Sequence, residues 1–190
     1  MTDLILASAS PRRQQLLGVF GMTFSVMSAD IDETPLADER ADDMTRRLAE
    51  EKARCIFRQV NPVDGNCRVL AGDTTVAVDG DILGKPENRD QAIDMLSRLS
   101  GRSHWVHTAV ALADNRGCRS KLASTEVCFH HLSDELITTY CDTREPYDKA
   151  GAYGIQGPGG QFVATINGSY SAVVGLPLWE TGQLLMADSN

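Results

Sequence analysis

Strands and helices alternate along the first half of the chain, and paired strands dominate the second half. A short apolar run over residues 4–7 leads to Ser10, which can cap a helix, and to Pro11, which suits a first helical turn. Later strands are separated by turn residues such as Asn167-Gly168. This order predicts an α/β fold, a mixed sheet with flanking helices.

Periodicity and turn residues set the other expected elements. Helices are predicted over residues 11–18, about 36–59, about 89–100, 133–141 and 177–186. Strands are predicted over residues 4–7, 23–27, 69–71, 76–78, 105–113, 121–129, 162–166 and 170–174. Turn residues at 61–66 stop the second helix. With 190 residues and 42% hydrophobic content, the chain is expected to form one domain over residues 1–190, with room for two lobes.

Charge and cysteine content exclude several classes of function. The formal charge of −8 argues against general affinity for nucleic acid or anionic lipid, since both require a basic surface. The five cysteines show no CxxC spacing, so reduced thiols are expected rather than disulfides or a zinc site. No stretch has the length of a membrane span, and the first apolar run is too short for a signal peptide. We expect a soluble cytoplasmic protein that binds neither nucleic acid nor membrane.

The first candidate site is the segment from Ser8 to Arg13. A strand that feeds a capped helix directs free backbone amides at the turn between them. The hydroxyl groups of Ser8 and Ser10 and the guanidinium groups of Arg12 and Arg13 could hold a polyphosphate there. Spacing alone leaves an equal alternative, in which Ser10 only caps the helix and the arginines are solvated.

Acidic residues on two separate segments form the second candidate site. Glu33 follows Asp30 and Asp32 in an acidic loop, and Asp73 follows Gly72 at the expected end of an apolar strand. Mg²⁺ takes few oxygen ligands from a protein and the rest from water and phosphate, so two carboxylates are enough. An acidic loop is more often only solvated. Asp73 is the stronger candidate, because α/β sheets present ligands at strand ends.

Two lysines stand out by their positions. Met44, Leu48 and Ile56 define the inward stripe of the second helix, and Lys52 falls in the same series. It either reaches a phosphate from beneath a pocket or extends its ammonium past the edge of the core into solvent. Lys85 lies between Gly84 and Pro86 on a rigid turn, which is not a P-loop, and the alternative is that it is only an exposed turn residue.

A glycine-rich segment, residues 148–157, is too irregular for a helix or a strand. Glycines let backbone approach a flat or charged ligand, and Lys149 adds a cation. The amide of Gln156 can donate to and accept from a base edge. A flexible surface loop is the alternative, but Tyr153 and Ile155 would then need somewhere to bury.

Other chemistries find less support in the sequence. His104 and His107 lie three residues apart, which on a strand directs them to opposite faces, so a shared metal is not expected. The sequence contains no GxSxG motif, which disfavours a serine hydrolase.

Six motifs occur in order along nearly the whole chain, and together they resemble the Maf family of nucleotide pyrophosphatases. They are residues 8–13, Glu33, residues 51–53, residues 72–74, residues 84–86 and residues 148–151. The resemblance implies a mixed α/β fold related to the inosine triphosphate pyrophosphatases, a cleft between two lobes and often a homodimer. Within the family the sequence is similar to the branch that hydrolyses dTTP and UTP, in which positions matching Arg12, Thr74 and Gln156 are associated with base choice.

These residues suggest a mechanism. Mg²⁺ or Mn²⁺ held by Glu33 and Asp73 would bridge phosphate oxygens. Either Asp73, as the catalytic residue, or a hydroxide bound to the metal would supply the activated water. The resemblance, and not the spacing, selects the α-phosphorus, which gives a monophosphate and pyrophosphate. The cations and hydroxyls that would hold the triphosphate are Ser8, Ser10, Arg12, Arg13, Lys52, Lys85 and Lys149.

Two other functions remain open at the level of the sequence. One is a nucleotide-binding regulator of cell division that does not hydrolyse its ligand. The other is a pyrophosphatase with another base preference, such as 7-methyl-GTP, although the branch with that preference usually has Trp and Gln at the positions of Arg12 and Thr74. The nucleoside triphosphate itself is the expected partner in each case.

Overall fold

One mixed sheet runs through the middle of the protein. The computed structural model describes residues 4–60 and 67–186, and within these ranges seven strands pair in the order β2-β1-β3-β5-β6-β7, with β4 on β3. β1 is parallel to β2 and β3, and the other pairs are antiparallel. The strands are β1 (Leu4–Leu6), β2 (Phe24–Val26), β3 (Arg68–Val78), β4 (Asp81–Leu83), β5 (Ser103–Asp114), β6 (Gly117–Phe129) and β7 (Val163–Asn167). The expected mixed α/β class is confirmed.

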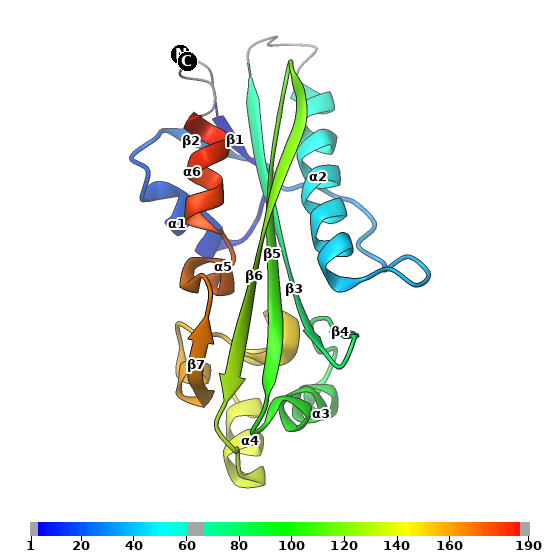
Figure 1. Ribbon diagram of the computed structural model, residues 1–190, viewed down its shortest axis with the longest axis vertical. Helices are drawn as coiled ribbons and strands as arrows, with labels where there is room; N and C mark the ends of the chain where they lie inside the picture. Colours follow the sequence, from blue (N-terminus) through cyan, green and yellow to red (C-terminus); the bar gives the residue numbers. More distant parts are fainter. Residues whose placement is uncertain (1–3, 61–66, 187–190) are drawn as a thin grey trace.

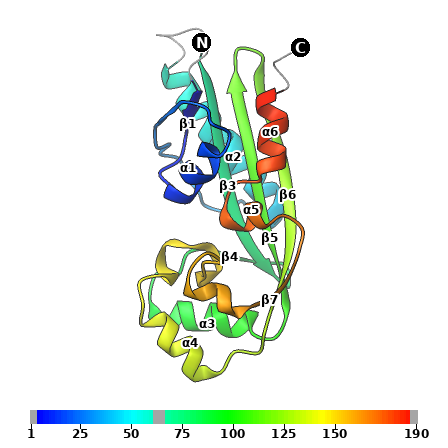
Figure 2. The ribbon, with the colours of Figure 1, turned by 90° about the vertical axis from the view of Figure 1, so that its left-hand side faces the viewer.

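The helices divide the molecule into two lobes that share the long strands β3, β5 and β6 (Figure 1). They are α1 (Pro11–Gly18), α2 (Ala41–Val60), α3 (Arg89–Leu99), α4 (Asp134–Cys141), α5 (Tyr170–Val174) and α6 (Leu178–Met186), with short 3₁₀ turns η1 (Pro146–Asp148), η2 (Ala150–Ala152) and η3 (Pro158–Phe162). One lobe contains α1, α2 and α6, and the other contains α3, α4 and the 3₁₀ turns (Figure 2).

Separate clusters of apolar side chains stabilise the two lobes. α2 packs on β3 and β5 over Ala49, Ala53 and Ile56, while Leu17 and Leu185 lie in a second cluster of the same lobe. The other lobe has its own core, which includes side chains from α3 and α4. The described residues contain no helix that is both long and apolar enough to cross a membrane.

The inward stripe of α2 is confirmed, but the predicted start of this helix is wrong. Residues 36–40 lie outside the helix because Glu39 folds the segment into a turn, where its Oε2 accepts from Leu36 N at 3.0 Å. The guanidinium of Arg47 binds both oxygens of Glu39 and donates to the carbonyl of Thr34. The predicted stop at residues 61–66 lies outside the described residues.

β3 is one continuous strand rather than two short runs, so Asp73 lies inside the strand and not at its end. Its pairing with β5 runs without interruption from Val69 to Ala77. Gly72 fits this strand because a side chain there would crowd its neighbours: an added Cβ would lie 3.3 Å from Nε of Arg13. Gly72, which follows the end of the predicted strand 69–71, therefore makes room for an arginine inside the longer strand.

The predicted strand over residues 170–174 is wrong, because this segment forms α5. The hydroxyl of Ser169 caps the helix by accepting from Ala172 N at 3.2 Å, and Gly175 ends it with a φ of 128°. The turn at Gly168 therefore leads into a helix, and the antiparallel partner of β7 is β6.

His104 makes the stability of the second lobe depend on pH. Its ring is buried, its Nε2 lies 2.8 Å from the hydroxyl of Tyr153, and burial lowers its pKa to about 4 from 6.5. The unfolded chain binds the proton more tightly, so stability is full above pH 6.5 and falls as the pH drops towards 4. We expect a loss of about 3 kcal/mol over this window. Chemical denaturation at several pH values measures this change. The unfolding free energy of His104→Phe should depend less steeply on pH than that of the original protein.

Candidate active site

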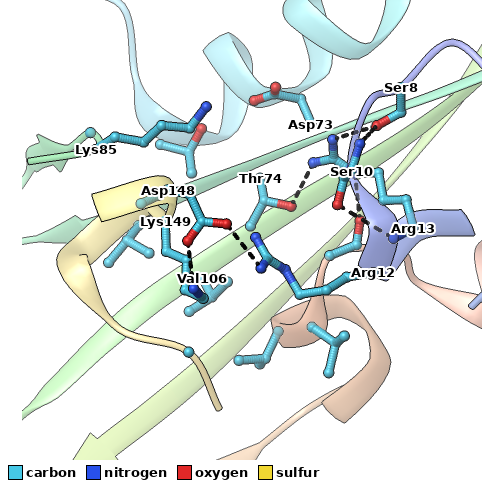
Figure 3. Close-up of a pocket in the computed structure, with 18 of the residues that line it drawn as sticks. Ser8, Ser10, Arg12, Arg13, Asp73, Thr74, Lys85, Val106, Asp148 and Lys149 are labelled. Atoms are coloured by element: carbon cyan, nitrogen blue, oxygen red, sulfur yellow. Dashed lines mark hydrogen bonds and ion pairs between the residues drawn. The ribbon is translucent and has the colours of Figure 1, made fainter. Parts of the chain in front are cut away.

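A cavity of about 920 Å³ lies between the two lobes. Residues that precede and begin α1, residues inside β3, the segment after β4 and residues 145–157 all contribute to its wall (Figure 3). The eleven residues singled out from the sequence all line this cavity: Ser8, Ser10, Arg12, Arg13, Glu33, Lys52, Asp73, Thr74, Lys85, Lys149 and Gln156. The structure brings them together, and their individual roles stay predictions.

The turn between β1 and α1 is built as the sequence suggests. Ser10 caps α1 and its hydroxyl accepts from Arg13 N at 3.4 Å. Ser8 adds a second hydroxyl, which accepts from Ser10 N at 3.2 Å and from Nη1 of Arg13 at 3.3 Å. Both proposed functions of Ser10, capping and lining the site, are therefore compatible with one geometry.

Arg13 is a cation held in a fixed orientation. Its Nε donates to the carbonyl of Gly175 at 2.8 Å, and its Nη2 donates to Oγ1 of Thr74 at 3.2 Å. Burial lowers the pKa of Arg13, and the charge of Asp73 acts in the opposite direction. A guanidinium fixed in this way presents charge to a ligand without first losing side-chain freedom.

Lys52 joins the two acidic segments. Its Nζ lies 2.7 Å from Oε1 of Glu33 and 2.7 Å from Oδ1 of Asp73. Only 11% of the Lys52 side chain and 9% of the Asp73 side chain are exposed, while Glu33 is about half exposed. The solvated alternative for Lys52 is therefore wrong: its ammonium is directed into the cavity and not past the core into water.

The cations of the cavity keep Glu33 ionised. Partial burial alone would raise the pKa of the Glu33 carboxyl. The hydrogen bond from Lys52 and the charges of Lys52, Lys85 and Arg13 outweigh burial and lower this pKa below its ordinary value. Asp32, by contrast, accepts from Thr34 N at 2.9 Å and stabilises the loop locally.

Residues from the second lobe close the other side of the cavity. Nη1 of Arg12 lies 3.3 Å from Oδ2 of Asp148, an ion pair that spans the two lobes (Figure 3). Asp148 also pairs with Lys149 through its other oxygen. Lys85 extends from the segment after β4 towards the cavity (Figure 3).

The glycine-rich segment packs against the cavity and is not a free surface loop. Gly151 N donates to the carbonyl of Gly84 at 3.1 Å, and Gly151 has a φ of 71°. A Cβ at this position would lie 2.9 Å from Cγ1 of Val76, so only glycine fits. Tyr153 is buried, whereas the side chain of Gln156 is exposed along the cavity wall.

The two carboxylates suit a hard divalent cation that a phosphate ligand also contacts. Glu33 and Asp73 converge on a single ammonium, and Mg²⁺ is commonly bound by one or two carboxylates together with substrate phosphates. In residues 4–60 and 67–186, no group of three or more His, Cys, Asp or Glu side chains could hold a metal ion. The residues present fit a cation shared with a ligand and not a closed structural site.

Several residues of the site were not assigned a role from the sequence. The hydroxyl of Thr108 donates to the carbonyl of Ala172 at 2.7 Å, so its oxygen accepts from the hydroxyl of Thr74 at 3.2 Å and orients that side chain. The carbonyl of Gly175 orients Arg13. Glu145 also lines the cavity. Backbone carbonyls and strand-to-strand contacts leave no motif, so no local signal could have identified Thr108 or Gly175.

The mixed sheet and the clustered cations around two carboxylates define an α/β protein with a cleft suited to a phosphate-rich ligand. A family model described as "Maf-like protein" matches residues 3–187, and the chain belongs to this family. One relative, named dTTP/UTP pyrophosphatase, from Colwellia psychrerythraea, is 52% identical over 183 residues, which cover 96% of this chain and 86% of the relative. A relative with the same name from Pseudoalteromonas atlantica is 50% identical over 96% of this chain and 95% of its own length.

Solved structures of lower similarity were also found. A nucleoside-triphosphatase (dITP/XTP pyrophosphatase) from Mycobacterium abscessus is 17% identical, with a TM-score of 0.42, over 69% of this chain and 76% of the other. The Ham1 protein of Staphylococcus aureus is 14% identical, with a TM-score of 0.44, over 70% of this chain and 73% of the other.

Proposed function

We propose that this protein is a nucleoside triphosphate pyrophosphatase that hydrolyses dTTP and UTP to the monophosphate and pyrophosphate. Its family membership and the names of relatives at 50–52% identity support this proposal. The observation that carries it is the ammonium of Lys52, which lies 2.7 Å from both Glu33 and Asp73 within a cavity lined by arginines and lysines.

The cations of the cavity can neutralise a triphosphate chain. We assign this role to Arg13, Lys52, Lys85 and Lys149, with hydroxyl donors from Ser8 and Ser10. Phosphoryl-type transfer depends mainly on positioning and on stabilising charge at the leaving group, and a fixed, partly buried cation such as Arg13 provides both. The oxygen of water bonds to the α-phosphorus as the bond from that phosphorus to the pyrophosphate oxygen breaks.

Asp73 is the residue we assign to the water. Its Oδ1 accepts from Lys52, and we assign its Oδ2 to accept the proton as the oxygen of water bonds to phosphorus. Glu33 and Asp73 would hold Mg²⁺ or Mn²⁺, which supplies Lewis-acid charge to the phosphate oxygens when bound. Lys52 keeps the two carboxylates close together before the ligand arrives.

A substrate panel tests the proposed function directly. Pyrophosphate release is measured from dTTP, UTP, CTP, GTP and 7-methyl-GTP with Mg²⁺ or Mn²⁺. We expect the fastest turnover with dTTP and UTP. Binding of nucleotides without release from any of them would instead favour a regulator, and preference for 7-methyl-GTP would assign the protein to another branch.

Gln156→Ala is expected to reduce base discrimination. We assign Gln156 to the O4 and N3–H edge of thymine or uracil, together with Arg12 and Thr74, which line the same cavity. Loss of these bonds should lower kcat/KM for dTTP by about 10-fold or more while GTP hydrolysis changes little. Gln183→Ala, at an exposed position of α6, is the control. An equal loss for dTTP and GTP would remove Gln156 from base reading.

A further inference from the structure

The glycine-rich segment bends around the carboxylate of Glu145. Gly159 N donates to Oε2 of Glu145 at 3.0 Å. A Cβ added to Gly157 would lie only 1.8 Å from Oε1 of the same carboxylate, so a side chain at that position would displace the carboxylate. Glu145 itself lines the cavity beside Gly154 and Gly157, the residues on either side of Ile155 and Gln156. The path of this backbone is therefore shaped by a side chain and not by the glycines alone.

Tyr140 provides a second point of attachment for the same segment. Gly154 N donates to its hydroxyl at 3.3 Å, and the tyrosine is 3% exposed. Its ring makes an edge contact with Phe162, with centroids 4.8 Å apart. Burial, followed by the hydrogen bond and charge of Glu145, raises the pKa of the tyrosine hydroxyl. Tyr140 and Glu145 together hold both ends of residues 154–159.

Lys149 is attached to Glu145 in a different way. Its Nζ donates to the backbone carbonyl of Glu145 at 2.6 Å and not to the carboxylate. A change in the Glu145 side chain consequently leaves this contact in place. The Glu145 carboxylate therefore acts on the segment that carries Gln156. The ammonium of Lys149, which we propose binds phosphate, is held separately by the backbone of Glu145.

We propose that Glu145 is a positioning residue for base recognition: its carboxylate holds residues 154–159 in the shape that presents Gln156 to the cavity. This inference rests on the proposed function, because the base in question is that of the triphosphate. Glu145 acts through the backbone and through Gln156, and it does not contact the reacting phosphorus.

Steady-state kinetics of Glu145→Ala test the inference. The ratio of kcat/KM for dTTP to that for GTP should fall by about 10-fold, mainly through a higher KM for dTTP. Inhibition by inorganic pyrophosphate should stay within about twofold of the original, because the phosphate contacts are untouched. Glu135→Ala, which removes an exposed carboxylate from α4, is the matched control and should change neither quantity. An unchanged dTTP to GTP ratio in Glu145→Ala would overturn the proposal.

Gly157 supplies a second, independent variant. Gly157→Ala should reproduce the loss of discrimination, because its methyl group would displace the Glu145 carboxylate. In the Glu145→Ala background that clash is absent, so the second substitution should cost less than half of its effect in the original protein. Fully additive effects of the two substitutions would show that Gly157 and Glu145 act separately, and would contradict the proposal.

Hydrogen–deuterium exchange separates this inference from the proposed function. In Glu145→Ala, exchange should rise at the amides of Gly154, Gly157 and Gly159 and stay unchanged in β5. If the original protein hydrolyses no triphosphate, the proposed function fails, and discrimination is then measured as binding of dTTP against GTP. Unchanged exchange at the three glycines, or equal weakening of dTTP and GTP, overturns the role of Glu145 even when the original protein is fully active.

Discussion

Asp73→Asn is expected to lower kcat for dTTP hydrolysis by roughly 10²-fold or more while the protein stays folded. Asparagine keeps the shape of the side chain and one oxygen for Lys52, but it removes the charge and the basicity that water activation requires. Binding of dTTP should weaken less than turnover, because the arginines and other lysines of the cavity remain. Pyrophosphate release and nucleotide titration on the same preparation measure the two quantities.

Asp114→Asn provides a control of the same chemistry. Asp114 is buried to the same degree as Asp73, at 7% exposure, but it lies at the end of β5 beside Arg119. This variant should lose stability and keep its kcat. Near-normal turnover in folded Asp73→Asn protein would remove Asp73 from the mechanism, whereas an equal loss of kcat in both variants would point to a general effect of the buried charge.

The elements that could be predicted from the sequence are those with a regular spacing of apolar residues or a helix-capping residue. The stripe of Met44, Leu48 and Ile56 placed Lys52 on the buried face of α2, and Ser10 marked the start of α1. In both cases the signal lies within one helix, where residues three or four apart along the chain are also neighbours in space. Local chemistry was sufficient for these predictions.

The errors arose where a contact that the residue pattern does not reveal decides the local structure. Gly72 suggested a break in β3, but the strand continues because it pairs with β5 without interruption from Val69 to Ala77. Residues 170–174 have the composition of a strand, yet the cap from Ser169 turns them into a helix. The helix α2 begins at Ala41 and not at residue 36 as predicted. Arg47, in the second turn of the helix, binds Glu39 and holds it outside the helix.

The candidate site follows the same division. Residue types and their motifs identified which side chains line the cavity. The family that these motifs resemble indicated that they belong to one site. The contacts between them could not be read from spacing, because Lys52, Glu33 and Asp73 lie on three elements that meet only in the folded protein. For the same reason the bond from Gly159 to Glu145, fourteen residues apart, had no sequence signal.

Lys52→Met is expected to affect both stability and turnover. Methionine keeps the length and apolar packing of the side chain but leaves Glu33 and Asp73 facing each other without the shared cation. Removing one partner of a buried ion pair costs about 3–5 kcal/mol, and the half-exposed Glu33 places this case near 3 kcal/mol. Turnover of dTTP should fall by roughly 10²-fold, since one phosphate-binding cation and the order of the carboxylates are lost together. Urea unfolding and pyrophosphate release measure these effects.

Arg98→Met is the matched control for stability. Arg98 and Asp81 form an ion pair at 2.7 Å, but 34% and 69% of their side chains are exposed, so its loss should cost less than about 1 kcal/mol.

A divalent cation offers a further test without substrate. Mg²⁺ or Mn²⁺ should raise the unfolding temperature of Lys52→Met more than that of the original protein, because the cation replaces the missing positive charge between two carboxylates.

Each combination of outcomes for Lys52→Met has a distinct meaning. Loss of stability with full turnover would make Lys52 a structural partner of Asp73 that takes no part in catalysis. Loss of turnover without any stabilisation by Mg²⁺ or Mn²⁺ would separate the lysine from the metal and assign it to phosphate alone. Wild-type stability together with wild-type turnover would contradict the arrangement from which the proposed function is argued, because that arrangement depends on one buried ammonium holding two carboxylates in the same cavity.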